Sequence, residues 1–253
     1  MSAVTVKIEG TRADLRLNRP EVLNAVDLDV FDGLSSATDE IAGNRDVRVV
    51  VVSGEGRAFC SGIDVTSLGE VAGSLPEMIA RAQAGFRKLA GLPVPTIAAV
   101  QGYAYGAGLQ IALACDLRVL ARDAKVGLLE MNYGLIPDLC GSTRLPQLVG
   151  AGRAKRMIWL AERIDAAEAE HIGIAEWVVE PNRLTATVNE IAGRLAEAPP
   201  VPVAEAKALV ERAHLRDLED GMDAEAEAQM RCMSDPGFGD AVMAGVQQRA
   251  SRA

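Results

Sequence analysis

The sequence has few of the residues from which metal, redox and nucleophilic sites are built. Its 253 residues include two histidines, His171 and His214, and four widely separated cysteines at positions 60, 115, 140 and 232. No Cys-x-x-Cys pair occurs, and two histidines do not supply the spacing of a zinc site. We therefore expect no metal, and we expect Cys60 and Cys115 to be buried, unreactive thiols. A serine peptidase is disfavoured, because both histidines lie outside the glycine-rich segments.

Aromatic residues, basic charge and long apolar runs are also scarce. Phe, Trp and Tyr make up 4% of the chain, the formal net charge is −9, and the sequence pI is about 4.9. This composition disfavours nucleic acid and anionic membranes as partners. No apolar run is long enough to span a bilayer, and the N-terminal residues carry charge where a signal peptide would be apolar. We expect a cytoplasmic protein.

Hydrophobic residues, by contrast, are abundant at 49% and allow one large domain with a substantial core. Short β-branched runs alternate with helical patterns, which is typical of a layered α/β fold. Strands are expected at 4–9, 13–17, 47–52, 96–100, 117–121 and 177–179. Helices are expected from the N-cap Asp27 to 42, and at 77–90, 109–114, 151–161, 166–171, 182–196, 202–212, 217–232 and 235–249.

Prolines at 199, 200 and 202 mark an internal boundary. They divide the chain into a core, residues 1–198, and a helical C-terminal region, residues 199–253. That region has more apolar residues than so short a segment can bury internally, namely Ala208, Leu209, Leu215, Leu218 and Met222. We therefore expect this region to lie at the interface of a homo-oligomer.

Two glycine-rich loops each follow an expected buried strand. One covers residues 53–64, and the other contains glycines 102, 106 and 108 just before an uncharged helix. Glycine lets the backbone turn sharply and lets a ligand approach it closely. N–H groups at the start of a helix lack intrahelical partners and can hold an oxygen that becomes negative during a reaction. A tight turn packed in a core explains the same residues equally well.

Several stretches together resemble signature segments of the enoyl-CoA hydratase/isomerase (crotonase) superfamily. They are LNRPEVLNA at 17–25, GRAFCSGID at 56–64, VQGYAYGAG at 100–108, ACD at 114–116, GLIP at 134–137, RLP at 144–146 and IDAAEAEHIG at 164–173. The resemblance covers essentially the whole chain. It implies an α/β crotonase-like spiral of ββα units, whose helical C-terminal region forms trimers or dimers of trimers and helps to close the pocket. It also implies an acyl-CoA thioester substrate, with coenzyme A as part of that substrate and no separate cofactor.

The resemblance further assigns roles to residues by position. The backbone N–H groups of Ile63 and Ala107 would form an oxyanion hole, and Glu130 and Asp138 are the acid/base candidates. Gln110 stands where hydratases of this family have a second glutamate. The other expected substrate-binding residues are Val22, Leu23, Ala25, Arg57, Ser61, Asp64, Val65, Tyr103, Gly106 and Leu129. Among these, Arg57 is a candidate phosphate contact, and Asp64 resembles a residue that fixes its loop.

Some positions depart from the family pattern. Glu21, Gly245 and Gln248 replace residues that some relatives place near the phosphates and adenine of coenzyme A, so weaker contacts are expected there. Gln110 cannot exchange a proton, and losing one group of an acid/base pair costs roughly 10²–10⁴-fold in rate.

Shifting a double bond needs only one base, so isomerisation is favoured over hydration. A hydratase in which Asp138 compensates for Gln110 remains open, as does a non-catalytic acyl-CoA-binding protein. Asp138 is equally well explained as a turn or N-cap residue.

Overall fold

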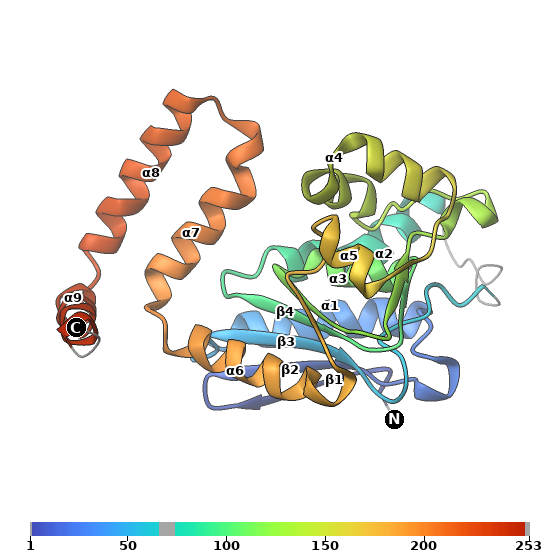
Figure 1. Ribbon diagram of the computed structural model, residues 1–253, viewed down its shortest axis with the longest axis horizontal. Coiled ribbons are helices and arrows are strands. Elements are labelled where there is room, and N and C mark those ends of the chain that lie inside the picture. Colours follow the sequence, from blue (N-terminus) through green and yellow to red (C-terminus); the bar gives the residue numbers. More distant parts are fainter. Residues whose placement is uncertain (1, 66–73, 251–253) are drawn as a thin grey trace. The chain divides into compact units, whose positions relative to one another are not determined.

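The computed structural model describes residues 2–65 and 74–250, with side chains described as far as Gln247 (Figure 1). The chain forms two compact units. The first extends to Ala196, apart from residues 93–95; the second consists of residues 93–95 and the chain from Glu197 onward.

The first unit is built on a six-stranded sheet with the strand order β1-β2-β3-β4-β6-β9. These strands are β1 (Val4–Glu9), β2 (Arg12–Leu17), β3 (Val49–Gly54), β4 (Thr96–Val100), β6 (Leu117–Ala121) and β9 (Trp177–Val179). β1 and β2 form the expected antiparallel hairpin, and every later neighbour in the order pairs in parallel. Four consecutive valines at the start of β3 are buried, as a central strand covered on both faces requires.

β3 begins two residues later than predicted. Val47 lies in a turn, where its N–H donates to Asn44 O (3.3 Å), and the parallel ladder starts where Val49 pairs with Arg12 of β2. The β-branched run therefore indicates the strand correctly, while pairing with β2 sets its register.

A second sheet of three short strands was not predicted. It contains β5 (Tyr103–Tyr105), β7 (Lys125–Gly127) and β8 (Ile164–Asp165), with β5 and β7 parallel. Strands of two or three residues are too short to show a period of two in the sequence. β5 follows β4 and β7 follows β6, so the chain passes twice from the large sheet to the small one.

Helices cover both faces of the large sheet (Figure 1). The helices of this unit are α1 (Leu28–Gly43), α2 (Leu75–Ala90), α3 (Ala107–Ala114), α4 (Gly141–Trp159), α5 (Ala166–His171) and α6 (Leu184–Glu197). α1 packs against β1, with a Cβ built at Gly33 only 3.0 Å from Val4 Cβ. α6 lies on the opposite face, where Arg12 Nη1 donates to Asn189 Oδ1 (2.7 Å).

Capping side chains set the starts of α1 and α2. Asp27 caps α1 as predicted, accepting a hydrogen bond from the Val30 N–H (3.0 Å). α2 starts at Leu75 rather than at residue 77, because Ser74 and Glu77 form a capping box. The helix predicted at 151–161 is the second half of α4, which begins at Gly141 and kinks at Gly150.

The second unit contains α7 (Pro200–Arg212), α8 (Leu218–Met233) and α9 (Phe238–Ala250). Arg231 of α8 makes a bidentate ion pair with Glu205 of α7, at 2.7 and 2.9 Å. Several large apolar side chains of this unit remain exposed, including Val210 (75%), Leu215 (73%), Leu218 (80%) and Met222 (61%). Among the described residues of both units, no helix is long and apolar enough to cross a membrane.

Candidate active site

The two glycine-rich loops are joined by backbone hydrogen bonds. The Cys60 N–H donates to Tyr103 O (2.9 Å), and the Tyr105 N–H donates to Cys60 O (3.0 Å). Gly108 has to be glycine for this contact, because a Cβ there would lie 2.4 Å from Cys60 O. The junction brings the Gly62–Ile63 and Gly106–Ala107 peptides together, and the Cβ position of Gly106 is 3.8 Å from Gly62 Cα.

The N–H groups of Ile63 and Ala107 are both available at this junction. Ile63 forms a parallel bridge to Val26, in which Val26 N–H donates to Gly62 O and Asp64 N–H donates to Val26 O, each at 2.8 Å. The intervening Ile63 N–H therefore points away from Val26. Ala107 is the first residue of α3, where no intrahelical acceptor exists. Within the described ranges, neither group donates to a backbone carbonyl.

Gln110, one turn further along α3, contacts Glu130 directly. Its Oε1 accepts hydrogen bonds from the N–H groups of Leu139 (2.8 Å) and Gly141 (2.9 Å). Because these donors identify the amide oxygen, the amide nitrogen is the atom that faces Glu130, and Nε2 donates to Glu130 Oε1 at 2.7 Å. Gln110 is thus held as a hydrogen-bond donor to Glu130.

Cys140 makes this double acceptor geometry possible. Its φ of 104° lies in the left-handed region, which turns the N–H groups on either side of it toward one oxygen. Its Sγ–H donates to Gln110 O (3.3 Å), and burial raises the pKa of the thiol to about 12. A non-glycine residue in such a conformation costs of order 1–3 kcal/mol. No sequence feature singled out Cys140 for this role.

Glu130 begins the 3-10 helix η2 (Glu130–Tyr133) and is 8% exposed. Burial raises the pKa of its carboxyl group; the nearby charge of Asp138 raises it further, and the hydrogen bond from Gln110 opposes the shift. Its second oxygen, Oε2, is buried and has no hydrogen-bond partner in the described part of the chain. The alternative that Glu130 is a surface carboxylate is therefore wrong.

Asp138 lies in the turn before α4, with its N–H donating to Ile136 O (2.9 Å). Cys140 holds the N-cap position, so the N-cap interpretation of Asp138 is wrong and the turn interpretation is right. Gln83 of α2 donates to the Asp138 backbone oxygen (2.7 Å). The carboxyl group is half-buried, and burial raises its pKa.

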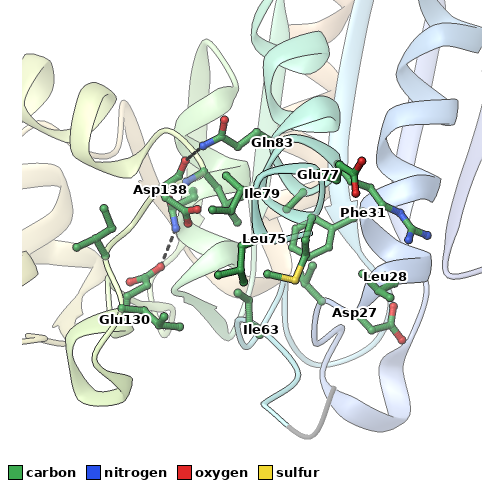
Figure 2. A pocket seen from close by; sticks show the side chains of 18 residues that line it. Asp27, Leu28, Phe31, Ile63, Leu75, Glu77, Ile79, Gln83, Glu130 and Asp138 are labelled. Carbon is green, nitrogen blue, oxygen red and sulfur yellow. Dashed lines mark hydrogen bonds between the residues drawn. The ribbon is translucent and has the colours of Figure 1, made fainter. Parts of the chain in front are cut away.

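Glu130, Asp138, Gln110 and Ile63 line one cavity of about 660 Å³. Figure 2 shows Glu130 and Asp138 on one side, Leu28, Phe31 and Glu77 on the other, and Ile63, Leu75 and Ile79 between them. The remaining wall residues are Val26, Asp27, Met78, Arg81, Ala82, Gln83, Leu135, Ile136 and Leu139. The sequence did not single out the walls contributed by α1, α2 and residues 135–136. A carboxyl pair at one end of a largely apolar cavity suits acid/base chemistry on an apolar ligand.

Most other expected binding residues lie on loops beside the glycine junction. The Ser61 N–H donates to Leu23 O (3.0 Å) and its Oγ to Val22 O (3.4 Å). Arg19 donates to Ala25 O (2.6 Å) and pairs with Asp64 Oδ2 (3.4 Å), which supports a loop-fixing role for Asp64. Gly106 lies against Glu130, and Leu129 directly precedes η2. Tyr103 lies on β5 and stacks with Tyr105. Arg57 and Val65 are exposed on the loop that follows β3.

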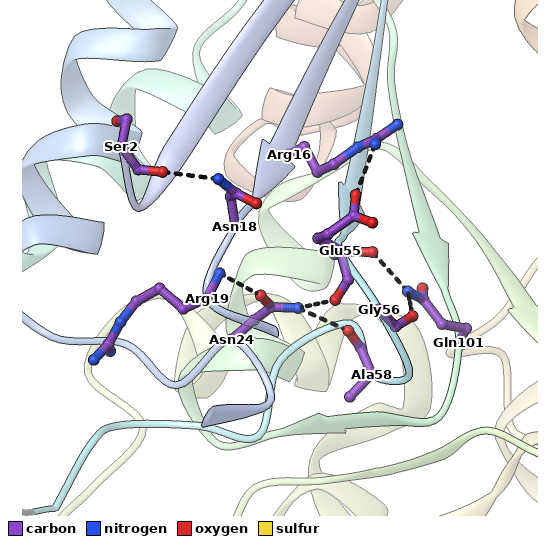
Figure 3. A network of polar contacts seen from close by, with 10 residues as sticks. Ser2, Arg16, Asn18, Arg19, Asn24, Glu55, Gly56, Ala58 and Gln101 are labelled. Carbon is purple, nitrogen blue, oxygen red and sulfur yellow. Dashed lines mark hydrogen bonds and ion pairs between the residues drawn. The ribbon is translucent and has the colours of Figure 1, made fainter. Parts of the chain in front are cut away.

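The loop that carries Val22, Leu23 and Ala25 is held by the buried side chain of Asn24 (Figure 3). Its Oδ1 accepts from the Arg19 N–H (2.8 Å), and its Nδ2 donates to the carbonyls of Glu55 and Ala58, both at 2.9 Å. Asn24 has a positive φ of 56°, which asparagine tolerates better than most residues. The first loop is thereby fixed to the glycine-rich loop of residues 53–64.

Cys60 and Cys115 are buried as predicted, and burial raises the pKa of the Cys60 thiol to about 12. No cluster of three or more His, Cys, Asp or Glu side chains in the described ranges is arranged to hold a metal ion.

Comparison with known proteins gives consistent matches along the chain. The family model described as enoyl-CoA hydratase/isomerase matches residues 7–247. A short-chain-enoyl-CoA hydratase of Clostridium acetobutylicum is 34% identical over 257 aligned residues, covering 98% of this chain and 96% of that protein.

Solved structures agree with this match. The putative enoyl-CoA hydratase of Thermobifida fusca YX in complex with CoA has a TM-score of 0.86 at 35% identity, covering 92% of this chain and 93% of that one. Enoyl-CoA hydratase from Bacillus anthracis has a TM-score of 0.91 at 30% identity, with 97% and 96% coverage. The expected fold class is confirmed.

Proposed function

The chain belongs to the enoyl-CoA hydratase/isomerase family, and from this premise we propose that it moves the double bond of an enoyl-CoA from the C3–C4 position to the C2–C3 position. The substrate would be an acyl-CoA thioester, in keeping with the CoA complex of the Thermobifida fusca protein. Glu130 would be the proton carrier, and the N–H groups of Ile63 and Ala107 would form the oxyanion hole.

The observation that carries this proposal is the contact between Gln110 and Glu130. Two backbone N–H groups hold the Gln110 oxygen, and its Nε2 lies 2.7 Å from Glu130 Oε1. An amide neither takes up nor releases a proton at ordinary pH. Direct contact also leaves no room for a water molecule between these two atoms. One carboxylate, that of Glu130, remains for proton transfer beside α3, and its Oε2 is buried without a hydrogen-bond partner among the described residues.

The reaction can be written with one base. Glu130 removes a proton from C2 of a 3-enoyl thioester, and the electron pair spreads over the chain and onto the thioester oxygen as a dienolate. Two N–H donors stabilise that oxygen, and one such donor typically contributes ~2.7–4 kcal/mol to transition-state stabilisation. Glu130 then returns its proton to C4, so that the double bond lies between C2 and C3 and the base is regenerated.

Hydration is a second candidate, because relatives of this chain are named as hydratases. Adding water across C2 and C3 delivers a hydroxyl group to C3 and a proton to C2, which requires a second group to manage the proton of water. Asp138 lies in the same cavity as Glu130 and would fill that role.

Two isosteric variants test which carboxyl group works. We expect Glu130→Gln to lower the migration rate of a 3-enoyl-CoA by at least about 100-fold while binding of a saturated acyl-CoA persists. We expect Asp138→Asn to retain most of the rate. The reverse result would make Asp138 the base, and wild-type rates in both variants would leave the proposed reaction without a proton carrier.

A further inference from the structure

The part of the cavity remote from Glu130 consists mostly of apolar side chains. α1 contributes Leu28 and Phe31, and α2 contributes Leu75, Met78 and Ile79. Such a wall stabilises an aliphatic group by burying it. Charged groups at its edge decide which acyl chains can enter.

Among the described residues of the wall, Arg81 is the one Lys or Arg side chain, and it is already paired. Its Nε donates to Asp32 Oδ1 (2.7 Å), and Nη2 donates to Asp32 Oδ2. Hydrogen bonding to Arg81 lowers the pKa of Asp32, so the carboxylate stays ionised. A bidentate pair of this kind uses the Nε–H and Nη2–H edge of the guanidinium, one of the edges that binds a carboxylate.

Carboxyl groups are distributed along the rest of the wall. Glu77 belongs to the capping box of α2, and the hydrogen bonds from Ser74 lower its pKa. Asp27 caps α1 and pairs with Arg19 Nη1 at 2.9 Å. Glu130 and Asp138 occupy the catalytic end.

From this arrangement we infer that the site accepts uncharged aliphatic acyl groups and rejects acyl groups that end in a carboxylate. A ligand carboxylate would enter an apolar cavity without a free cation and beside carboxyl groups, and a charge left without a partner weakens binding strongly. This inference rests on the proposed function for the identity of the thioester end. It concerns the far end of the acyl chain.

The test compares two saturated six-carbon thioesters, which bind without reacting. Isothermal titration of the wild-type protein with hexanoyl-CoA and with adipoyl-CoA measures the selectivity directly. We expect hexanoyl-CoA to bind at least about 100-fold more tightly. Adipoyl-CoA binding within about threefold of hexanoyl-CoA would overturn the inference and leave the proposed function standing, whereas failure of both thioesters to bind would overturn both.

A pair of matched variants tests the role of Arg81. Asp32→Asn releases the guanidinium of Arg81, which can then bind the carboxylate of adipoyl-CoA. The preference for hexanoyl-CoA over adipoyl-CoA should therefore fall by about tenfold. Asp39→Asn is the control, since it removes a carboxylate from another ion pair between α1 and α2, Lys88 Nζ–Asp39 Oδ2 at 2.5 Å. Neither residue of that pair lines the cavity. Equal selectivity in the two variants would contradict the inference that Asp32 keeps Arg81 from binding a ligand carboxylate. The comparison of the two thioesters on the wild-type protein is valid even if Asp32→Asn fails to fold.

Discussion

At the scale of single residues, the proposed reaction depends on the hydrogen bond that Gln110 donates to Glu130. Its oxygen is occupied by the N–H groups of Leu139 and Gly141, so its nitrogen can only donate to the neighbouring carboxyl group. A donated hydrogen bond favours the ionised carboxylate, whereas burial and the charge of Asp138 favour the protonated acid. The balance leaves the pKa of Glu130 above its ordinary value, which suits a group that must both take and return a proton.

The pH dependence of catalysis tests this balance. If Glu130 is the base, as proposed, it must be ionised to act, so kcat/KM should fall as the pH drops through a pKa above the ordinary 4.5. Gln110→Leu removes the hydrogen bond that lowers the pKa and should move this acid limb to higher pH. Asp138→Asn removes a charge that raises the pKa and should move the limb to lower pH.

Rate profiles of the two variants and the wild type, measured across the acid range with one 3-enoyl-CoA, decide the matter. Opposite displacements support the assigned roles of Gln110 and Asp138. A shift of the acid limb in the same direction in both variants would contradict the assigned contacts of Glu130.

Part of this site was predictable from single residues, and part was not. The apolar neighbours of Glu130 predicted its burial correctly. The amide orientation of Gln110 depends on backbone groups 29 and 31 positions further along the chain. Between those two groups lies Cys140 with a left-handed backbone, for which the sequence shows no signal.

At the scale of elements, sequence patterns predicted the presence of the strands of the large sheet more accurately than the residues at which the strands begin and end. β4, β6, β9 and α5 have the predicted boundaries because a clear apolar run or cap ends them. β3 is displaced, since its ladder with β2 determines where it begins. The small sheet escaped prediction because its strands are recognisable only by their pairing in space.

Asn24 illustrates how one side chain can hold two elements together, and it gives a stability prediction. Asn24→Ala leaves the Arg19 N–H and the carbonyls of Glu55 and Ala58 without this partner, and it places alanine at positive φ. We expect the free energy of unfolding to fall by about 3 kcal/mol. Urea denaturation followed by circular dichroism measures this change.

The matched control is Asn18→Ala in the same region (Figure 3). Asn18 makes one exposed hydrogen bond, from Nδ2 to Ser2 O at 3.1 Å. Its loss should cost less than about 0.5 kcal/mol. Equal destabilisation by both variants would mean that the network around Asn24 does not hold the loop.

At the scale of the whole molecule, the second unit exposes large apolar side chains to solvent. Such exposure is typical of a surface that another protein chain covers. Leu215 and Leu218 are 73% and 80% exposed. We expect sedimentation velocity at micromolar concentration to show a trimer or a dimer of trimers. Leu215→Glu combined with Leu218→Glu should shift the protein toward monomer, and the neighbouring surface change Glu219→Gln should not. A monomeric wild-type protein would contradict this expectation.

The family and fold were predictable because the resemblance extends along nearly the whole chain, and the comparisons confirm both. The reaction within the family depends on a few side chains, and the hydratase names of relatives do not decide it for a chain with Gln110 in this place. Selection between migration and hydration therefore has to be measured.

The most direct measurement is the ratio of two initial rates for the wild-type protein: migration of the double bond in 3-hexenoyl-CoA and addition of water to 2-hexenoyl-CoA. Gln110→Glu is the matched variant, because it restores a second carboxyl group beside Glu130 without changing the side-chain length. We expect migration to be faster than hydration in the wild type, and the ratio to fall in the variant. Faster hydration than migration by the wild-type protein would contradict the assignment of Glu130 as a lone proton carrier.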